Sequence, residues 1–278
     1  MENIDNLASI IITFIGSGLV AGFTAGLLGI GGGIIFVPMF YFVFGNLLHI
    51  PESTAIVMAT SSSLLTMIPT SYTSCMSHYK KGNIDVSILK SWLPFLLTGV
   101  IIGSITSSLH GGKWLTILFG SILFLSALNM LFFSKLFSKE RNLPKLLPGQ
   151  AIIASTISTV SVLLGIGGGT LTVPTLSFFN YDTKKAVGIS SAVGFIICLP
   201  GAIVHLITDI ISDVKIENSP PLTIGYTCIL AVLFVIPFSV ITAPLGVKVN
   251  KALPEIIIKR IFAILLVFTS IKMIVSVF

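Results

Sequence analysis

Stretches without a charged residue dominate the chain and alternate with short segments that carry the charges. Seven of these stretches contain no Asp, Glu, Lys or Arg: residues 6–51, 53–79, 91–112, 114–134, 146–181, 186–208 and 218–247. Each is long enough to cross a bilayer, because a membrane-spanning helix needs about 20 apolar residues. An eighth segment, 256–278, carries its cations near its two ends, where long side chains reach the membrane surface. The pattern predicts an all-α protein that crosses a membrane several times.

The two halves of the chain carry the same glycine-rich motif. Leu-Leu-Gly-Ile-Gly-Gly-Gly occupies residues 27–33 and returns at 163–169, and a Val-Pro pair follows each copy at the same spacing. The segment after each motif also aligns, with an offset of 131 residues that pairs Ala55 with Ala186, Thr60 with Ser191 and Pro69 with Pro200. Self-similarity at a fixed offset indicates an internal repeat.

Each repeat is predicted to hold an apolar run, the glycine break, a short apolar run and three full-length helices. In the first repeat, residues 7–137, the apolar segments are 7–28, 34–46, 53–77, 88–109 and 113–137. In the second repeat, residues 149–278, they are 149–164, 170–180, 184–208, 222–246 and 255–278, and residues 138–148 form a linker. The short runs are too short to span a bilayer, so the chain has about eight to ten membrane segments.

The distribution of Lys and Arg predicts how the repeats are oriented. If each glycine-broken pair forms a hairpin, the second repeat is inverted relative to the first, and 13 of the 16 cations then fall in loops on one side. Parallel repeats would lose this bias, and cytoplasmic loops carry the excess of Lys and Arg in membrane proteins. We therefore expect two inverted repeats, a cytoplasmic linker and both termini on the outer side.

The composition excludes several classes of protein. Hydrophobic residues make up 54% and charged residues 9% of the chain, whereas a soluble domain has about 25% charged residues. The net charge of +6 comes from scattered loop cations, so no nucleic-acid partner is predicted. The three cysteines lie in apolar stretches without metal-ligand spacing, and neither a metal nor a cofactor is predicted. No nucleophile elbow or metalloprotease motif is present, so an enzyme is not expected.

The two glycine breaks are the main candidate site. A helix interrupted inside hydrocarbon is tolerated only where it is buried in protein or lines a water-filled cavity. Successive glycine amides can turn toward one point, and the short helix that follows adds its positive dipole end, so the backbone alone can hold an anion. The candidate glycines are Gly29, Gly31, Gly32, Gly33, Gly165, Gly167, Gly168 and Gly169. The alternative is that these small residues only allow helices to pack closely.

Hydroxyl side chains follow each break and extend the candidate site. Thr60 and Ser61 in the first repeat, and Ser190 and Ser191 in the second, could donate hydrogen bonds to an anion. The alternative is that each bonds the backbone of its own helix. No predicted span carries a mid-membrane Lys, Arg, Asp or Glu, and His205 is the one candidate proton carrier, for which a structural role is favoured. Export needs no coupling group, because an inside-negative potential favours anion exit by about 2.3 kcal/mol per charge per 100 mV.

These motifs resemble those of the sulfite exporter TauE/SafE family of membrane transporters. The resemblance rests on the glycine motif with its proline at 26–38, its second copy ending at 174, and the segments 78–85, 220–226 and 244–248. It implies a transporter of anions such as sulfite, organosulfonates or related sulfur-containing acids in a bacterial inner membrane. Gly26 is replaced by Val162 in the second copy, which leaves open whether one break binds substrate or both.

The combined prediction is a secondary transporter or exporter of small anions that are bound by backbone amides at the two breaks. Its expected partners are the anion and the lipid bilayer, and association into a homo-oligomer is compatible with the sequence. An anion channel or facilitator is the alternative, with the same glycines as its filter. Paired discontinuous helices are the feature that favours a carrier.

Overall fold

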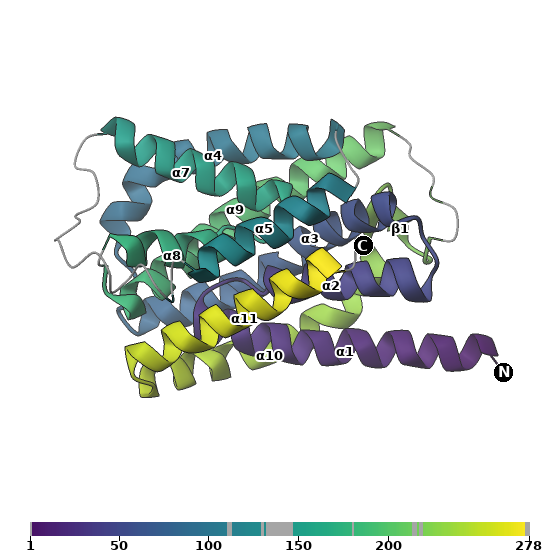
Figure 1. Cartoon of the computed structure of the whole chain (residues 1–278), viewed down its shortest axis with the longest axis horizontal. Helices are drawn as coiled ribbons and strands as arrows, with labels where there is room; N and C mark the ends of the chain where they lie inside the picture. The colour runs from purple at the N-terminus through teal and green to yellow at the C-terminus, as the bar shows by residue number, and fades with distance from the viewer. Residues whose placement is uncertain are drawn as a thin grey trace.

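The computed structural model describes residues 2–109, 113–128, 131, 147–179, 181–212, 216 and 219–275. Most of these residues form helices that run along the long axis of the molecule (Figure 1). The helices of the first half are α1 (Glu2–Leu28), α2 (Gly33–Phe42), the π-helical turn η1 (Val43–Leu47), α3 (Glu52–Lys80), α4 (Val86–Leu109) and α5 (Lys113–Leu128). Those of the second half are α7 (Leu147–Leu163), α8 (Gly169–Phe178), α9 (Thr183–Ser212), α10 (Ile229–Ala252) and α11 (Glu255–Val275).

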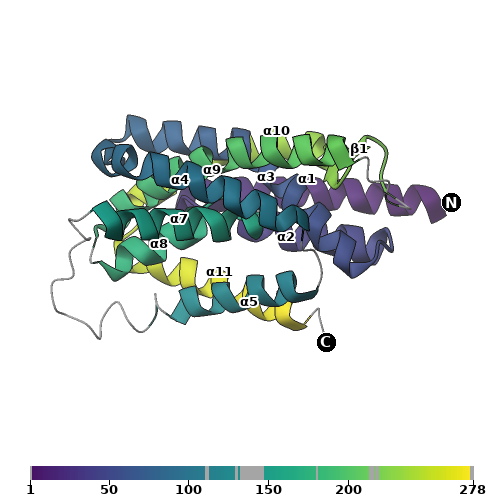
Figure 2. The same cartoon turned by 90° about the horizontal axis from the view of Figure 1, so that it is seen from above.

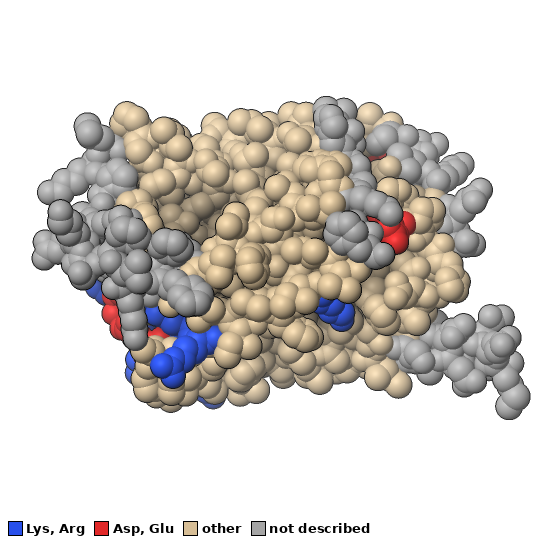
Figure 3. All heavy atoms as spheres, viewed as in Figure 1, with Lys and Arg blue, Asp and Glu red and all other residues tan. Residues whose placement is uncertain are grey.

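The helices have the lengths and apolar surfaces of a membrane protein, as the sequence predicts. Four described helices are long and apolar enough to cross a membrane, within the ranges Ile10–Leu28, Val86–Ser107, Thr183–Ile211 and Ile229–Ala252. On the face shown in Figure 3, Lys, Arg, Asp and Glu lie mainly toward the two ends of the long axis, and the surface between them is uncharged apart from one Lys or Arg patch nearer the middle. Charges at both ends and an uncharged belt between them are the pattern of a protein embedded in a bilayer.

Each main contact between two helices recurs between their counterpart helices when the first and second halves of the chain are exchanged. Helix α1 packs along α10, and α7, its counterpart in the second half, packs along α4, the counterpart of α10 (Figures 1 and 2). The counterpart helices α3 and α9 pack on each other, as do α5 and α11. The broken helices therefore lie against α3 and α9, whose hydroxyl-rich segments are buried.

The structure corrects one predicted helix and lengthens others, among them α1, which begins at Glu2 rather than at residue 7. The helix predicted over 222–246 begins at Ile229 and ends at Ala252, because a short antiparallel hairpin, β1 (Thr223–Ile224) and β2 (Thr227–Cys228), precedes it. Leu222 and Gly225 adopt left-handed φ angles of 61° and 52°, which a continuous α-helix excludes. Helices α3 and α9 extend beyond their predicted ends at 77 and 208, to Lys80 and Ser212. Residues 132–146, with the end of the predicted helix 113–137 and most of the predicted linker, lie outside the described residues.

Candidate functional site

Both glycine motifs break their helices in the same way. Helix α1 ends at Leu28 and α2 begins at Gly33, and three glycines of the first break, Gly29, Gly31 and Gly32, have φ angles of 68°, 71° and 97°. In the second break Gly165, Gly167 and Gly168 have φ angles of 67°, 63° and 73°. Residues with a Cβ rarely adopt these angles, so the glycines are required by the backbone conformation itself. Gly32 and Gly168 are the left-handed N-cap residues of the two short helices.

The two breaks lie directly against each other. A Cβ atom on Gly33 would stand 2.6 Å from Cα of Ile166, and a Cβ atom on Gly169 would stand 2.5 Å from Cα of Ile30. Each break also packs on the long helix of the other half, since a Cβ on Gly165 would stand 2.6 Å from Cα of Thr60 and one on Gly29 would meet the carbonyl of Val187 in α9. Gly29, Gly33, Gly165 and Gly169 therefore allow the backbones of the two halves to pack closely.

The remaining glycines offer backbone donors. Among the described residues, the N–H groups of Gly31, Gly32, Gly167 and Gly168 have no hydrogen-bond partner. All four residues are buried, and buried amides without a partner are rare in proteins. Thr170, in the first turn of α8, is also fully buried and its hydroxyl has no partner within the described part of the chain. Unpaired donors at two facing helix N-termini are suited to an anion.

One side chain occupies the space between the two breaks. The Cε methyl of Met67 in α3 lies 2.5 Å from the position that a Cβ on Gly31 would take. It also contacts the position that a Cβ on Gly167 would take. Met67 is fully buried, and its counterpart at the 131-residue offset is Cys198, whose Sγ lies 2.5 Å from the same Cβ position of Gly167. A methionine is flexible enough to move from such a position without a backbone change.

The four candidate hydroxyls are all engaged in hydrogen bonds. Thr60 donates to the carbonyl of Val57 at 2.9 Å and Ser191 to that of Gly188 at 2.7 Å, both within their own helices, as the alternative interpretation expected. Ser190 lies 2.8 Å from the carbonyl oxygens of both Gly29 and Gly169, so it joins the two breaks.

The fourth hydroxyl, that of Ser61, pairs with the Thr227 hydroxyl at 2.6 Å. Ser63 belongs to the same run of hydroxyl residues in the sequence, and its hydroxyl donates to the carbonyl of Gly165 at 2.8 Å.

Polar side chains also cap the end of α1, which sequence reasoning missed. Ser74 lies 3.1 Å from the carbonyl oxygen of Ala25, and Nε2 of His78 lies 2.9 Å from that of Gly26. Asn250 of α10 donates to the carbonyl of Leu27 at 2.7 Å. The Ala25 carbonyl also accepts from the N–H of Gly29 at 2.9 Å, so it is His78 and Asn250 that satisfy carbonyls which the helix break leaves without a helical partner. In the sequence these residues can be recognised only as polar residues on one face of a helix. That this face is buried becomes clear only once α3 is known to lie inside the bundle.

A buried acid is the other group that the sequence prediction missed. Asp209 is 4% exposed and lies near the end of α9, beyond the predicted helix end at 208. Its Oδ2 accepts hydrogen bonds from the backbone N–H of Tyr226 at 3.1 Å and from the Thr227 hydroxyl at 3.0 Å. Asp209 thus lies near the end of α9, whereas the expectation from the sequence concerned acids at mid-span.

Cations from both halves gather at one end of the molecule. Nζ of Lys184 lies 3.3 Å from the carbonyl oxygen of Lys251, and Lys81 lies near enough to Lys248 and Lys251 to feel their charges. Burial and these neighbouring charges lower the pKa of Lys81. Positive charges in this density attract anions to this end of the protein.

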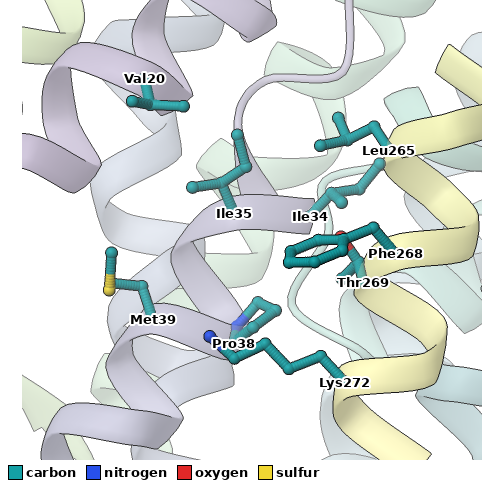
Figure 4. Close-up of a pocket in the computed structure, with 9 residues that line it drawn as sticks. All are labelled: Val20, Ile34, Ile35, Pro38, Met39, Leu265, Phe268, Thr269 and Lys272. Atoms are coloured by element: carbon teal, nitrogen blue, oxygen red, sulfur yellow. The ribbon is translucent and has the colours of Figure 1, made fainter. Parts of the chain in front are cut away.

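An apolar pocket of about 200 Å³ lies between α1, α2 and α11, outside the breaks (Figure 4). Its lining includes Val20, Ile34, Pro38 and Phe268, and Val20 and Phe268 are more than half exposed, so the pocket opens to the surface. Lys272 stands at its edge, with Nζ 5.6 Å from the centre of the Phe42 ring. This lining suits a hydrocarbon chain better than a free anion, so the pocket is not the candidate anion site.

The helix lengths, the uncharged belt and the two facing breaks define a multi-pass membrane protein built around paired discontinuous helices. Residues 14–273 match the sulfite exporter TauE/SafE family, and the chain belongs to this family. It is 28% identical to a protein of Haemophilus influenzae over 92% of this chain and 95% of that protein, which is named a probable membrane transporter protein.

Further relatives carry similar names. A protein of Bacillus subtilis is 26% identical over 92% of this chain and 94% of its own length, and one of Methanocaldococcus jannaschii is 29% identical over 84% of each chain. Both are also named probable membrane transporter proteins. No solved structure matches the chain. The family and these relatives make the protein a membrane transporter.

Proposed function

We propose that the protein is a secondary transporter of small anions, with sulfite, organosulfonates and related sulfur-containing acids as the substrate class. The observation that carries the proposal is the set of four buried amides without a partner, those of Gly31, Gly32, Gly167 and Gly168. They lie at the N-terminal ends of two short helices whose breaks touch each other, where the helix dipoles favour negative charge. The description of the family as sulfite exporters supports the substrate class.

We further propose that the two repeats, 7–137 and 149–278, are inverted relative to each other in the membrane. The exchange of helix pairings between the halves supports this arrangement, as does the direct contact of the two breaks. Inverted repeats with discontinuous helices at the midplane are a common transporter design. The lysines gathered at one end support a cytoplasmic location for that end and for the linker, in a bacterial inner membrane with the termini outside.

The candidate hydroxyls take different parts in this proposal. Ser190 holds the two breaks together through their carbonyls, while Thr60 and Ser191 are bonded to their own helices, so these three shape the site. Ser61 bonds another hydroxyl, Thr227, and a hydroxyl pair can be redirected more easily than a bond to a helix carbonyl. The amides are therefore the primary ligands and Ser61 is the hydroxyl best suited to join them.

Thermal unfolding of the purified protein with a panel of anions tests the site. Sulfite, sulfate, methanesulfonate, taurine and acetate are added in turn to wild type and to the variants Gly31→Ala and Gly167→Ala. We expect the bound anion to raise the midpoint of unfolding in wild type and to have less effect in both variants, because a bound ligand stabilises the folded state by mass action.

Gly82→Ala is the matched control for this experiment. Gly82 has a φ angle of 70°, as Gly31 does, but a Cβ there would have nothing within 4 Å. It therefore carries the same backbone strain, about 1 kcal/mol, without touching the breaks. Equal anion stabilisation in wild type, both break variants and the control would remove the proposed site.

The position of Met67 favours a carrier over a channel. Its methyl group lies between the two breaks and keeps both buried, as expected for a closed state that must rearrange to pass a substrate. Flux in liposomes distinguishes the two classes. Saturation and stimulation by anion on the opposite side indicate a carrier, whereas linear, ohmic flux indicates a channel with the same glycines as its filter.

A further inference from the structure

A chain of hydrogen bonds connects the buried acid of α9 to the helix that supports the second break. Asp209, Thr227 and Ser61 are each at most 4% exposed, and they come from α9, the hairpin and α3. The Thr227 hydroxyl lies 3.0 Å from Oδ2 of Asp209 and 2.6 Å from the hydroxyl of Ser61. Residues that are far apart in the sequence are thus joined in one buried polar cluster.

The direction of these hydrogen bonds follows from the number of hydrogens. When the Asp209 carboxylate is ionised it can only accept, so Thr227 donates its single hydroxyl hydrogen to Oδ2. The Thr227 oxygen must then accept the hydrogen of Ser61. The hydroxyl hydrogen of Ser61 is therefore held away from the breaks whenever Asp209 carries its negative charge.

No described residue neutralises that charge. Among the described residues Asp209 has no ion-pair partner: the hairpin offers it the N–H of Tyr226 and the Thr227 hydroxyl, His205 lies one turn before it on α9, and α3 presents the hydroxyls of Ser61 and Ser62 to the hairpin. His205 is 3% exposed, and its Nε2 has no partner in the described part of the chain. A buried carboxylate without a countercharge is costly in a membrane protein, and gaining a proton removes that cost.

We propose that Asp209 is the proton-carrying group of this transporter and couples anion transport to the movement of one proton. In the loading step a hydronium ion gives its proton to Oδ2, which forms one O–H bond on the carboxyl group and leaves a water molecule. Release to water on the other side reverses the step. This inference rests on the proposed anion transport, and it supplies the coupling group that the sequence prediction lacked.

Protonation of Asp209 reaches the anion site through the two hydroxyls. A protonated Oδ2 becomes a donor, so the Thr227 hydroxyl turns its hydrogen from Asp209 toward Ser61, and Ser61 is free to donate elsewhere. Ser61 lies nine residues into α3, about 14 Å along the helix from its start. The preceding residue, Thr60, packs on Gly165 of the second break. Ser61 therefore follows directly on the residue of α3 that contacts the second break, and the proposal is that its freed hydroxyl favours anion binding, so that the proton and the anion favour each other.

Infrared difference spectroscopy tests the proton site without any anion. Spectra of the purified protein are compared between mildly acid and mildly alkaline pH, where a buried carboxyl group that gains a proton shows a C=O stretching band of its own. We expect this band in wild type, its loss in Asp209→Asn and its retention in Asp182→Asn, the matched change at an exposed acid just before α9. A band unchanged in Asp209→Asn, or no such band in wild type, would overturn the proposal.

Transport in liposomes tests the coupling. The probe anions are sulfite and methanesulfonate, the second of which stays ionised throughout, and a pH-sensitive dye inside the liposomes reports proton movement. We expect an imposed anion gradient to drive protons in the same direction in wild type and in Asp182→Asn. In Asp209→Asn, which resembles the permanently protonated state, we expect anion exchange to continue and proton movement to fall to the level of protein-free liposomes.

The variant Thr227→Val separates the proton site from the connection to α3. It should keep the infrared band of Asp209 and lose the link between proton and anion movement, because the hydroxyl between Asp209 and Ser61 is absent. Full coupling in Thr227→Val, or a requirement for Na⁺ in place of the pH gradient, would contradict the proposal. If neither anion is transported or bound, the proposed function fails, while the infrared band still decides whether Asp209 carries a proton.

Discussion

The ends of α3 and α9 occupy equivalent places in the two halves but carry different chemistry. At the 131-residue offset Ser74 corresponds to His205 and His78 to Asp209. In the first half both side chains bond the last carbonyls of α1, and His78 also lies 3.3 Å from the Asn83 side chain. In the second half Asp209 turns to the hairpin instead, and Nε2 of His205 has no partner among the described residues.

The comparison shows that the glycine breaks are fixed by packing in both repeats, whereas the ends of α3 and α9 can differ between them. The glycine breaks keep the same residues and left-handed φ angles at the same three positions, because each touches the backbone of the other half. The helix ends lie farther from that contact, so one half uses its polar side chains to cap a helix and the other retains a buried acid. A repeat protein can thus hold a symmetric binding site and an asymmetric coupling group.

The largest expected effect comes from adding a methyl group where the breaks meet. Gly33→Ala and Gly169→Ala each place a Cβ within 2.6 Å of a backbone atom of the opposite break. We expect the free energy of unfolding in detergent to fall by the upper end of about 1–3 kcal/mol, because backbone atoms cannot move aside cheaply. Gly16→Ala is the control, since nothing lies within 4 Å of a Cβ there. Similar stability of all three variants would show that the breaks do not touch.

A smaller loss is expected when the hydroxyls that join the breaks are removed. Ser190 faces two buried carbonyls and Ser63 faces one, so Ser190→Ala should lower the free energy of unfolding by about 1–3 kcal/mol and Ser63→Ala by less. The counterpart of Ser190 in the first repeat is Ala59, which shows that alanine fits this helix position. Chemical denaturation of both variants measures the order, and a larger loss in Ser63→Ala would contradict it.

The two histidines provide a direct comparison of the halves. His78→Leu removes the partner of the Gly26 carbonyl and should destabilise the protein by about 1–3 kcal/mol. His205→Leu replaces a side chain whose Nε2 has no partner among the described residues, so it should be nearly neutral or stabilising. Thermal unfolding of both variants checks this. Equal destabilisation would mean that His205 has a structural partner and that the two ends are alike.

The smallest expected effect lies in the contact between the loops of the two halves. The Tyr181 hydroxyl donates to Oδ2 of Asp85 at 2.7 Å. Hydrogen bonds from Ser87 and Tyr181 hold the pKa of Asp85 below its ordinary value of 3.8. The stabilisation of the folded protein by these bonds is therefore complete above pH 3.8, and it is lost as the pH falls through the lower pKa of the folded state. Tyr181→Phe should therefore cost less than about 1 kcal/mol at neutral pH.

Unfolding measured against pH checks the sign of this effect. The difference between wild type and Tyr181→Phe should shrink as the pH falls below 3.8. Tyr79→Phe, a change at an exposed tyrosine of α3, should leave the unfolding curve unchanged at every pH. A difference that grows on acidification would contradict the assigned hydrogen bond.

Several features followed from the sequence because they depend on local chemistry. Apolar runs give the helices, and Gly29 to Gly33 and Gly165 to Gly169 mark the breaks because only glycine adopts their φ angles at low cost. The hairpin at 223–228 was missed because it lies within the charge-free stretch 218–247, and the left-handed Leu222 and Gly225 reveal the turn.

Other features were decided by the tertiary structure alone. Whether Ser190 or Thr60 faces a ligand, a carbonyl or its own helix depends on which helix lies opposite, and the opposite helix belongs to the other half of the chain. The position of Met67 between the breaks and the burial of Asp209 beside Thr227 likewise arise from contacts between segments far apart in the sequence. The sequence by itself thus determined where the helices run and where they must break. Packing between the halves decided which of the polar groups are satisfied and which remain free, because a hydrogen bond needs both of its partners in place.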